Sequence, residues 1–257
     1  MLIDFFEEYP DKINLRKAEL IDFDSTIYLA ARSFREFREA EKLLKEANPK
    51  LRAAFWPVLE SSYWISPFAR PSELAALFEA LLAEGRGGRL EILLDLELPL
   101  LRKSLLLMEF VHFLKNKTAI KNFLSDCGKQ NTGVTTAEYP GLCRAMRLFY
   151  QFAGLSWPAG VSPHKRIILF YSSMVKREWQ DKLFRRYLSE EARRTGRAIQ
   201  VGLGTIARGA FGDEPVLSPA GLGRDLSFLK ENGIERAVIF RLGGLNKDYL
   251  DTVTRYL

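Results

Sequence analysis

Eight short runs of apolar and β-branched residues recur along this chain of 257 residues, and they constrain its fold more than any other feature. Their length and composition are typical of β-strands. Segments with an apolar period of 3.6 residues lie between and after the runs, so the sequence predicts strands that alternate with helices. The predicted strands are 2–8, 26–31, 51–59, 90–98, 133–139, 166–172, 198–204 and 236–243.

Capping residues mark the ends of several predicted helices. Ser33 precedes the helical pattern over 33–47, and Asn246 precedes the last pattern. Pro71 and Ser72 stand before a third pattern, which Gly85 follows.

Eight strands, each followed by a helix, within a length close to about 250 residues predict a (β/α)₈ TIM barrel. A doubly wound open sheet is the main alternative, and it usually has a Gly-rich first turn. The turn after the first predicted strand, "EEYPDKIN", has no glycine. We therefore predict one barrel domain over 1–257, with a loop insertion at about 57–70 and a long helical segment at about 100–131.

Composition predicts a soluble, cytoplasmic protein. The apolar content of 47% supports a large core, and the N-terminus lacks the basic start of a signal peptide. The longest apolar stretch, over 98–114, contains Arg102, Lys103 and Glu109 and is shorter than the roughly 20 residues of a membrane span. The net charge of +6 is spread among acidic residues, which argues against a nucleic-acid surface. The sequence specifies no oligomeric state.

Strand 90–98 is the most informative about chemistry. In "LEILLDLELP", Asp95 and Glu97 share one face, and Ile92, Leu94 and Leu96 share the other. Helices cover the outside of such a barrel, so the leucine face should point outward and the carboxylates into the barrel mouth. Carboxylates about 7 Å apart on one strand separate each other's pKa values, so that one can act as an acid. The alternative is that one of the two pairs structurally with an arginine such as Arg241.

Other strand ends supply further candidates, because active sites of this fold lie where the strands end. We expect Glu138 as a catalytic partner of Glu97 and Tyr171 as a further catalytic residue. The expected substrate-binding residues are Glu8, Trp56, Tyr63, Trp64, Tyr139, Gly204, Arg208, Arg241, Gly243 and Gly244.

Absences narrow the chemistry further. The two histidines, His112 and His164, fall in a helical segment and before a strand, and the two cysteines, Cys127 and Cys143, lack the spacing of a zinc site. No predicted strand ends in lysine, which disfavours Schiff-base chemistry. We expect no metal and no cofactor. Carboxylates beside Trp and Tyr are what glycoside hydrolysis needs, so the expected partner is a glycan or another small molecule.

The end of strand 90–98, "LLDLE", resembles the D-x-x-D-x-D-x-E strand of family 18 glycoside hydrolases, the chitinase-like barrels. The segment "LFYS" resembles that family's M-x-Y-D and places Tyr171 at its tyrosine. The resemblance implies Glu97 as the acid, Asp95 as its assisting carboxylate, and retaining, substrate-assisted cleavage next to an N-acetyl sugar. The sequence departs from the family pattern, since Leu93 and Ser172 stand where it has aspartates.

Two other functions stay open. The glycines of "GLGT" and "LGGLN" end the last two predicted strands, where this fold often binds phosphate, and Arg208 and Arg241 would add positive charge. That pattern predicts a lyase, isomerase or hydrolase of a phosphorylated or anionic small molecule. A barrel that binds a glycan or a protein without turnover is the third possibility.

The tripeptide Glu-Tyr-Pro occurs twice, at 8–10 and 138–140. Both copies fall at the ends of predicted strands that lie half a turn apart around the barrel. A shared need for proline where a strand ends explains this as well as an ancestral duplication does. Either way, we predict that Glu8 and Glu138 face one barrel mouth.

Overall fold

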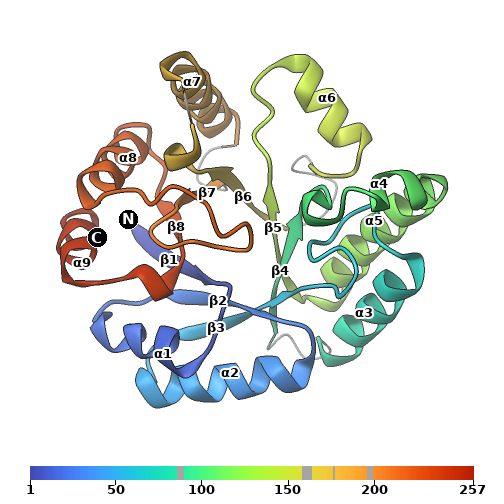
Figure 1. Ribbon diagram of the computed structural model, residues 1–257, viewed down its shortest axis with the longest axis horizontal. Coiled ribbons are helices and arrows are strands. Elements are labelled where there is room, and N and C mark those ends of the chain that lie inside the picture. Colours follow the sequence, from blue (N-terminus) through green and yellow to red (C-terminus); the bar gives the residue numbers. More distant parts are fainter. Residues whose placement is uncertain (86–89, 158–163, 176, 196–198) are drawn as a thin grey trace. The chain divides into compact units, whose positions relative to one another are not determined.

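The computed structural model describes residues 1–85, 90–157, 164–175, 177–195 and 199–257. Eight parallel strands close into a barrel in the order β1 to β8, which confirms the predicted (β/α)₈ fold (Figure 1). Ala198, at the start of one predicted strand, lies outside the described residues. The strands are β1 (Leu2–Glu7), β2 (Thr26–Ala31), β3 (Arg52–Pro57), β4 (Glu91–Leu96), β5 (Gly133–Glu138), β6 (Lys165–Phe170), β7 (Ile199–Gly204) and β8 (Arg236–Phe240).

Helices follow the strands, and their ends obey the expected capping chemistry. Ser33 Oγ accepts a hydrogen bond from the Glu36 amide at 3.2 Å, and Asn246 Oδ1 accepts one from the Tyr249 amide at 3.2 Å. The helices are α1 (Lys12–Leu15), α2 (Phe34–Ala47), α3 (Pro71–Glu84), α4 (Leu105–Met108), α5 (Phe113–Gln130), α6 (Arg144–Phe152), α7 (Glu178–Thr195), α8 (Pro219–Glu231) and α9 (Lys247–Val253).

Internal contacts group the chain into two compact units. Unit 1 comprises Met1–Ala54 and Ile167–Leu257, and unit 2 comprises Phe55–Arg166. The prediction of a single domain therefore stays a prediction. In unit 1 the two chain ends meet, since the Met1 ammonium donates to the Tyr256 carbonyl at 2.9 Å, and α9 lies beside them (Figure 1).

The strands are buried on both faces, as parallel strands covered by helices must be. All six residues of β2 are buried, and in β4 only the first residue, Glu91, is exposed. In unit 2 the helices α3 and α5 pack through Phe78 and Phe123, whose stacked rings lie 4.3 Å apart. No helix in the part of the chain that the structure describes is long and apolar enough to cross a membrane.

Two long connections lie in unit 2. Between β3 and α3, residues 58–70 form a loop that contains only isolated β-bridges, one of them between Leu59 and Tyr63. Between β4 and β5, the chain forms two 3₁₀ turns, Leu100–Arg102 and Phe110–His112, together with α4 and α5.

Candidate functional site

The C-terminal end of β4 brings two carboxyl groups together in unit 2. Asp95 is buried within the strand, and Glu97 follows directly after it and is half-buried. The register of the sheet places Asp95 opposite Ala137 of β5, two residues before Tyr139. Strand geometry thus delivers both acids and a tyrosine to one place, because β4 and β5 end side by side.

Two side chains form hydrogen bonds with Glu97. The Tyr139 hydroxyl donates to Glu97 Oε2, and the Asp95 carboxyl shares a hydrogen bond with Glu97. Burial raises the pKa of Glu97 to about 7, and both hydrogen bonds oppose that rise. Two carboxyl groups can share a hydrogen bond only through a proton, so the pair holds this proton until the pH rises to about 7.

The same contacts act on the tyrosine. Burial raises the pKa of Tyr139, and the nearby charge of Glu97 raises it further. Its ring also lies 5.8 Å from the ring of Tyr150. Tyr139 therefore stays a neutral hydrogen-bond donor that orients Glu97.

The loop between β3 and α3 lies against the end of β4. The Ile65 amide donates to the Asp95 carbonyl at 3.0 Å, and Leu59 and Tyr63 exchange two backbone hydrogen bonds of 2.8 and 3.1 Å. These bonds attach the loop that contains Tyr63 and Trp64 to the backbone of β4, and the two rings lie 5.2 Å apart, edge to face. Tyr63 is half-buried, whereas Trp64 and Trp56 are buried. Of these three expected sugar-binding rings, Tyr63 offers the most surface to a ligand.

Glu138 has a different environment from Glu97. Its buried carboxylate accepts from the Thr136 hydroxyl at 2.7 Å, from the Trp157 amide at 3.2 Å, and from Arg166 Nε and Nη2 at 3.1 and 2.7 Å. Four donors fill the acceptor positions of one carboxylate. These bonds favour a structural role for Glu138, and its expected catalytic role stays a prediction.

In unit 1 a comparable ion pair joins β1 to the end of β8. Glu7 Oε1 accepts from Arg241 Nη1 at 2.9 Å, and Oε2 accepts from the Gly243 amide at 2.6 Å. Burial raises the pKa of Glu7 to about 6, although Arg241 and the backbone bonds oppose that rise. Arg241 also donates to the carbonyl of the exposed Arg208 and lies 4.8 Å over the ring of Tyr9. An anion at these groups would have to compete with the carboxylate of Glu7.

Neighbouring atoms approach the expected phosphate-binding glycines closely. A Cβ on Gly204 would lie 2.7 Å from the Phe240 carbonyl oxygen, and its φ of +154° is rare for other residues. A Cβ on Gly244 would collide with the Ile206 carbonyl, and one on Gly243 with Asn14. The close approach of backbone therefore explains glycine at Gly204 and Gly244, whereas the atoms nearest to Gly243 belong to the side chains of Asn14 and Arg241, which can move.

Glu8 and Tyr171 complete the predicted residues of unit 1. Glu8 is buried beside Gly209, where a Cβ would lie 2.7 Å from Glu8 Oε2. Tyr171 is half-buried, and its ring lies 5.6 Å from that of Phe240. Because Glu8 and Glu138 belong to different units, a shared mouth for them stays a prediction.

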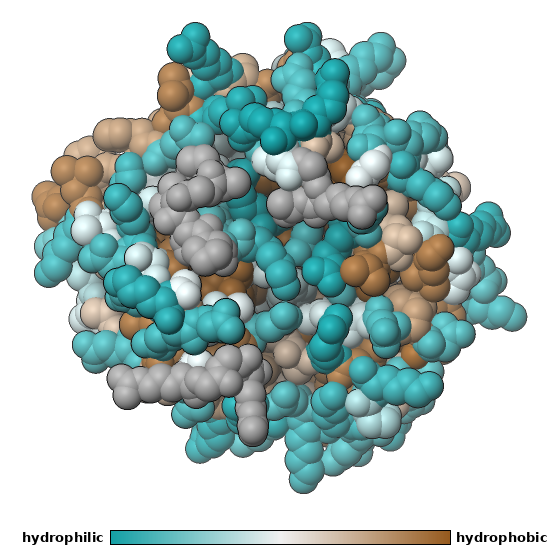
Figure 2. All heavy atoms as spheres, turned by 180° about the vertical axis from the view of Figure 1, so that it is seen from behind, coloured by the Kyte–Doolittle hydropathy of each residue, from teal (hydrophilic) through white to brown (hydrophobic). Residues whose placement is uncertain are grey.

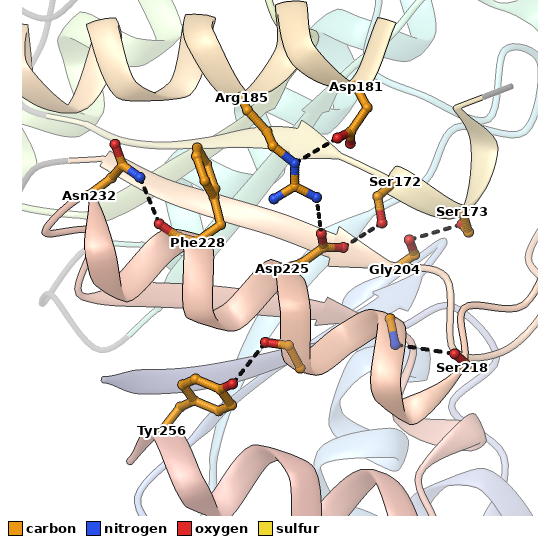
Figure 3. A network of polar contacts seen from close by, with 12 residues as sticks. Ser172, Ser173, Asp181, Arg185, Gly204, Ser218, Asp225, Phe228, Asn232 and Tyr256 are labelled. Atoms are coloured by element: carbon orange, nitrogen blue, oxygen red, sulfur yellow. Dashed lines mark hydrogen bonds and ion pairs between the residues drawn. The ribbon is translucent and has the colours of Figure 1, made fainter. Parts of the chain in front are cut away.

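Ser172, which stands where the family pattern has aspartate, is part of a structural network in unit 1 (Figure 3). Its hydroxyl donates to Asp225 Oδ2 on α8, and Arg185 Nη2 on α7 donates to Asp225 Oδ1 at 2.7 Å. Arg185 also bonds Asp181 at 2.7 Å. Ser172 therefore links β6 to the covering helices.

Sequence reasoning missed Arg166, the partner of one strand-end acid, and left another strand-end acid, Glu7, out of the expected site residues. The only sequence signal for Arg166, which pairs with Glu138, was its charge at the start of the apolar run 166–172. Glu7 is adjacent to Glu8, and the sequence offers no reason to choose Glu7 instead. Among the residues that the structure describes, no group of three or more His, Cys, Asp or Glu side chains has the geometry of a metal site.

No model of a known protein family matches this sequence, and no curated protein matches it. Solved structures do match its fold over the whole chain. A GH18 chitinase from Pseudoalteromonas aurantia is 10% identical with a TM-score of 0.61, and both chains are covered completely. A class V chitinase from Pseudomonas fluorescens Pf-5 is 9% identical with a TM-score of 0.61 and 99% coverage of each chain.

A D-allulose 3-epimerase from Methylomonas sp. also matches, at 12% identity and a TM-score of 0.54, over 100% of this chain and 98% of its own. The chain is thus a TIM barrel whose structural neighbours include GH18 chitinases and sugar epimerases. At such low identity, the likeness shows the fold alone.

Proposed function

We propose that this protein is a glycoside hydrolase that acts on a sugar or glycan, with Glu97 as the general acid. The observation that supports this most strongly is the hydrogen bond that the Tyr139 hydroxyl donates to Glu97, beside the buried carboxyl group of Asp95. Burial also raises the pKa of Glu97 to about 7. A carboxylic acid that keeps its proton near neutral pH can protonate the leaving oxygen of a glycosidic bond.

Asp95 assists Glu97 in this proposal. Before cleavage, the ionised Asp95 accepts the hydrogen bond of the shared proton and orients the carboxyl group of Glu97. Glu97 then passes that proton to the leaving oxygen as the bond between this oxygen and the sugar carbon breaks. The backbone bond from Ile65 to Asp95 supports this role, because the half-buried Tyr63 lies in the same loop and could offer its ring to a sugar.

A substrate-assisted mechanism suits the site in unit 2. Most retaining glycosidases need a second carboxylate as nucleophile, but some use the N-acetyl group of the substrate instead. Glu138, the other acid that β5 brings to this end of the sheet, is already held by four donors. An N-acetylated sugar would supply the nucleophile that the fixed Glu138 does not, so we propose a glycan with N-acetyl groups as substrate.

The anionic-substrate alternative has weaker support. Glu7 already accepts from the Gly243 amide and from Arg241, the groups expected to hold a phosphate. The binding-only alternative makes a different prediction from ours, because it expects affinity for glycans without turnover.

We further propose a cytoplasmic location. Both cysteines are free thiols, Cys127 buried and Cys143 exposed, which suits a reducing compartment. Recovery of the native protein with a secreted or periplasmic marker during cell fractionation would contradict this.

A panel assay tests the function. The wild type is incubated with N-acetylated oligosaccharides, neutral oligosaccharides and sugar phosphates, and the products are identified by mass spectrometry. We expect cleavage of the N-acetylated glycans and a loss of about 10²- to 10⁴-fold in kcat/KM for Glu97→Gln. Glu91→Gln is the matched control, because Glu91 begins the same strand and is exposed. Turnover of sugar phosphates alone would favour an enzyme that acts on an anionic substrate. Binding of glycans without turnover would favour a barrel that binds without catalysis.

A further inference from the structure

An exposed apolar surface lies on one side of unit 2. It is formed by α4, the following 3₁₀ turn, the start of α5 and one side of α6, and we call it the apolar patch. Its main members are Leu107, Phe110, Val111, Leu114, Phe149 and Phe152, all exposed. In Figure 2, brown residues gather at the left edge, where α4 and the start of α5 lie.

The patch is continuous across elements that are distant in the sequence. The ring of Phe113 lies 6.4 Å from that of Phe110 and 5.4 Å from that of Phe152 on α6. Lys117 Nζ on α5 donates to the Phe152 carbonyl at 2.8 Å. The helix α6 has no buried residue, so Phe149 and Phe152 on its apolar side are exposed to solvent.

The apolar patch exposes more area than the largest apolar patch of a typical monomeric protein. Leu107 is 85% exposed and Val111 80%. With side chains of roughly 150–250 Å² each, the six members together expose on the order of 700 Å², above the few hundred Å² typical of the largest patch on a monomer. Such a surface marks a contact with something apolar.

Basic residues alternate with the members of the patch along the chain. Residues 100–121 and 144–152 contain seven Lys or Arg side chains and one acidic residue, Glu109. Their net charge of +6 equals the net charge of the entire chain, so the rest of the chain is neutral on balance. The exposed basic members are Arg102, Lys103, Lys115, Lys121 and Arg144.

We propose that the apolar patch binds the surface of an anionic lipid bilayer. Exposed Leu, Val and Phe side chains interleaved with Lys and Arg are the composition of an interfacial segment, in which apolar groups enter the headgroup region and basic groups contact anionic lipids. The buried centre of a protein interface is instead depleted of charged residues. Pairing with a second copy would bring two surfaces of +6 face to face, which like-charge repulsion opposes.

Vesicle flotation tests this proposal with the full chain. Vesicles contain phosphatidylcholine alone or with phosphatidylserine, at low and at high salt. We expect binding to the phosphatidylserine vesicles, and binding to phosphatidylcholine alone that is at least ten-fold weaker. High salt should reduce the difference, because it screens the charges. Each Lys→Gln change at Lys103 or Lys115 should weaken binding about five-fold, whereas Arg35→Gln on the exposed side of α2 should not.

The apolar contribution needs its own variants. Leu107→Ser with Val111→Ser should abolish flotation, and because both side chains are exposed, the fold should persist by circular dichroism. Ile13→Ser in unit 1 is the matched control, since Ile13 is 78% exposed and lies outside the patch. The proposal is wrong if the wild type floats with neither vesicle. It is also wrong if the protein without vesicles is a dimer that Leu107→Ser splits, or if Ile13→Ser reduces flotation as much as the patch variants do.

Discussion

Replacing Glu97 by glutamine should stabilise the protein at alkaline pH while it removes activity. Burial raises the pKa of this carboxyl group from 4.5 to about 7, so the folded state favours its protonated form. Below pH 4.5 the group is protonated in both the folded and the unfolded state. As the pH rises toward 7 and above, the unfolded state releases the proton readily, and the folded state must then release it against burial.

The stability that this proton provides is therefore lost as the pH rises through about 7. A pKa change of this size corresponds to about 3 kcal/mol, and because Glu97 is half-buried, solvent screening reduces it to about 2 to 3 kcal/mol. Glutamine never ionises and does not lose this stability. We expect the free energy of unfolding of Glu97→Gln, relative to the wild type, to increase by that amount between about pH 4 and pH 8.

Urea unfolding at intervals across this pH range measures the effect, with Glu91→Gln as control. Glu91 is exposed and pairs with Lys165 at 3.6 Å, so its variant should follow the wild type at each pH. Burial also raises the pKa of Glu7, to about 6. The ionisation of Glu7 lowers the free energy of unfolding of the wild type and of both variants by the same amount, so it does not affect the difference between them. A difference between Glu97→Gln and the wild type that does not change with pH would refute the reasoning.

Three further changes test other parts of the structure. Tyr139→Phe removes a hydrogen bond that lowers the pKa of Glu97, so the alkaline limb of the kcat/KM profile should move to higher pH; an unchanged limb would argue against this contact. Arg166→Met leaves Glu138 buried without its cation and should cost about 3 to 5 kcal/mol by chemical denaturation, and a loss below 1 kcal/mol would show that the pair is weak. Gly204→Ala places a methyl group against the end of β8 and should cost about 1 to 3 kcal/mol, and unaltered thermal unfolding would contradict this close packing.

The strands could be predicted well because of how a parallel barrel is built. Each strand is buried on both faces, so it reads as a short apolar run; for example, run 26–31 matches β2 (Thr26–Ala31) at both ends. The helices were harder to delimit, since Pro71 begins α3 and Ser72 makes no cap. Arg70 occupies the N-cap position of α3, and its side chain makes no capping hydrogen bond. Proline suits the first turn of the helix, because it has no N–H group that needs a partner.

The candidate site could be predicted only in part. The alternation in β4 singled out Asp95 and Glu97 because a charge in a leucine run is unusual, and the structure joins the two by a hydrogen bond. The pairing of Glu138 with Arg166 was not predictable, because it joins two side chains 28 residues apart in the sequence whose contact depends on packing. The apolar side of α6 was also missed, since its pattern resembles that of a helix that packs on a core.

The central claim is that Glu97 protonates the leaving group, and the dependence of cleavage on that group tests it most directly. Single-turnover rates are measured for wild type and Glu97→Gln with two substrates that share one N-acetylated sugar. One substrate has a sugar as its leaving group, and the other has a nitrophenolate, which leaves without protonation. We predict that Glu97→Gln slows the first by about 10²- to 10⁴-fold and the second by less than about ten-fold. Equal losses with both substrates, or no loss with the first, would contradict the assignment of Glu97 as the general acid.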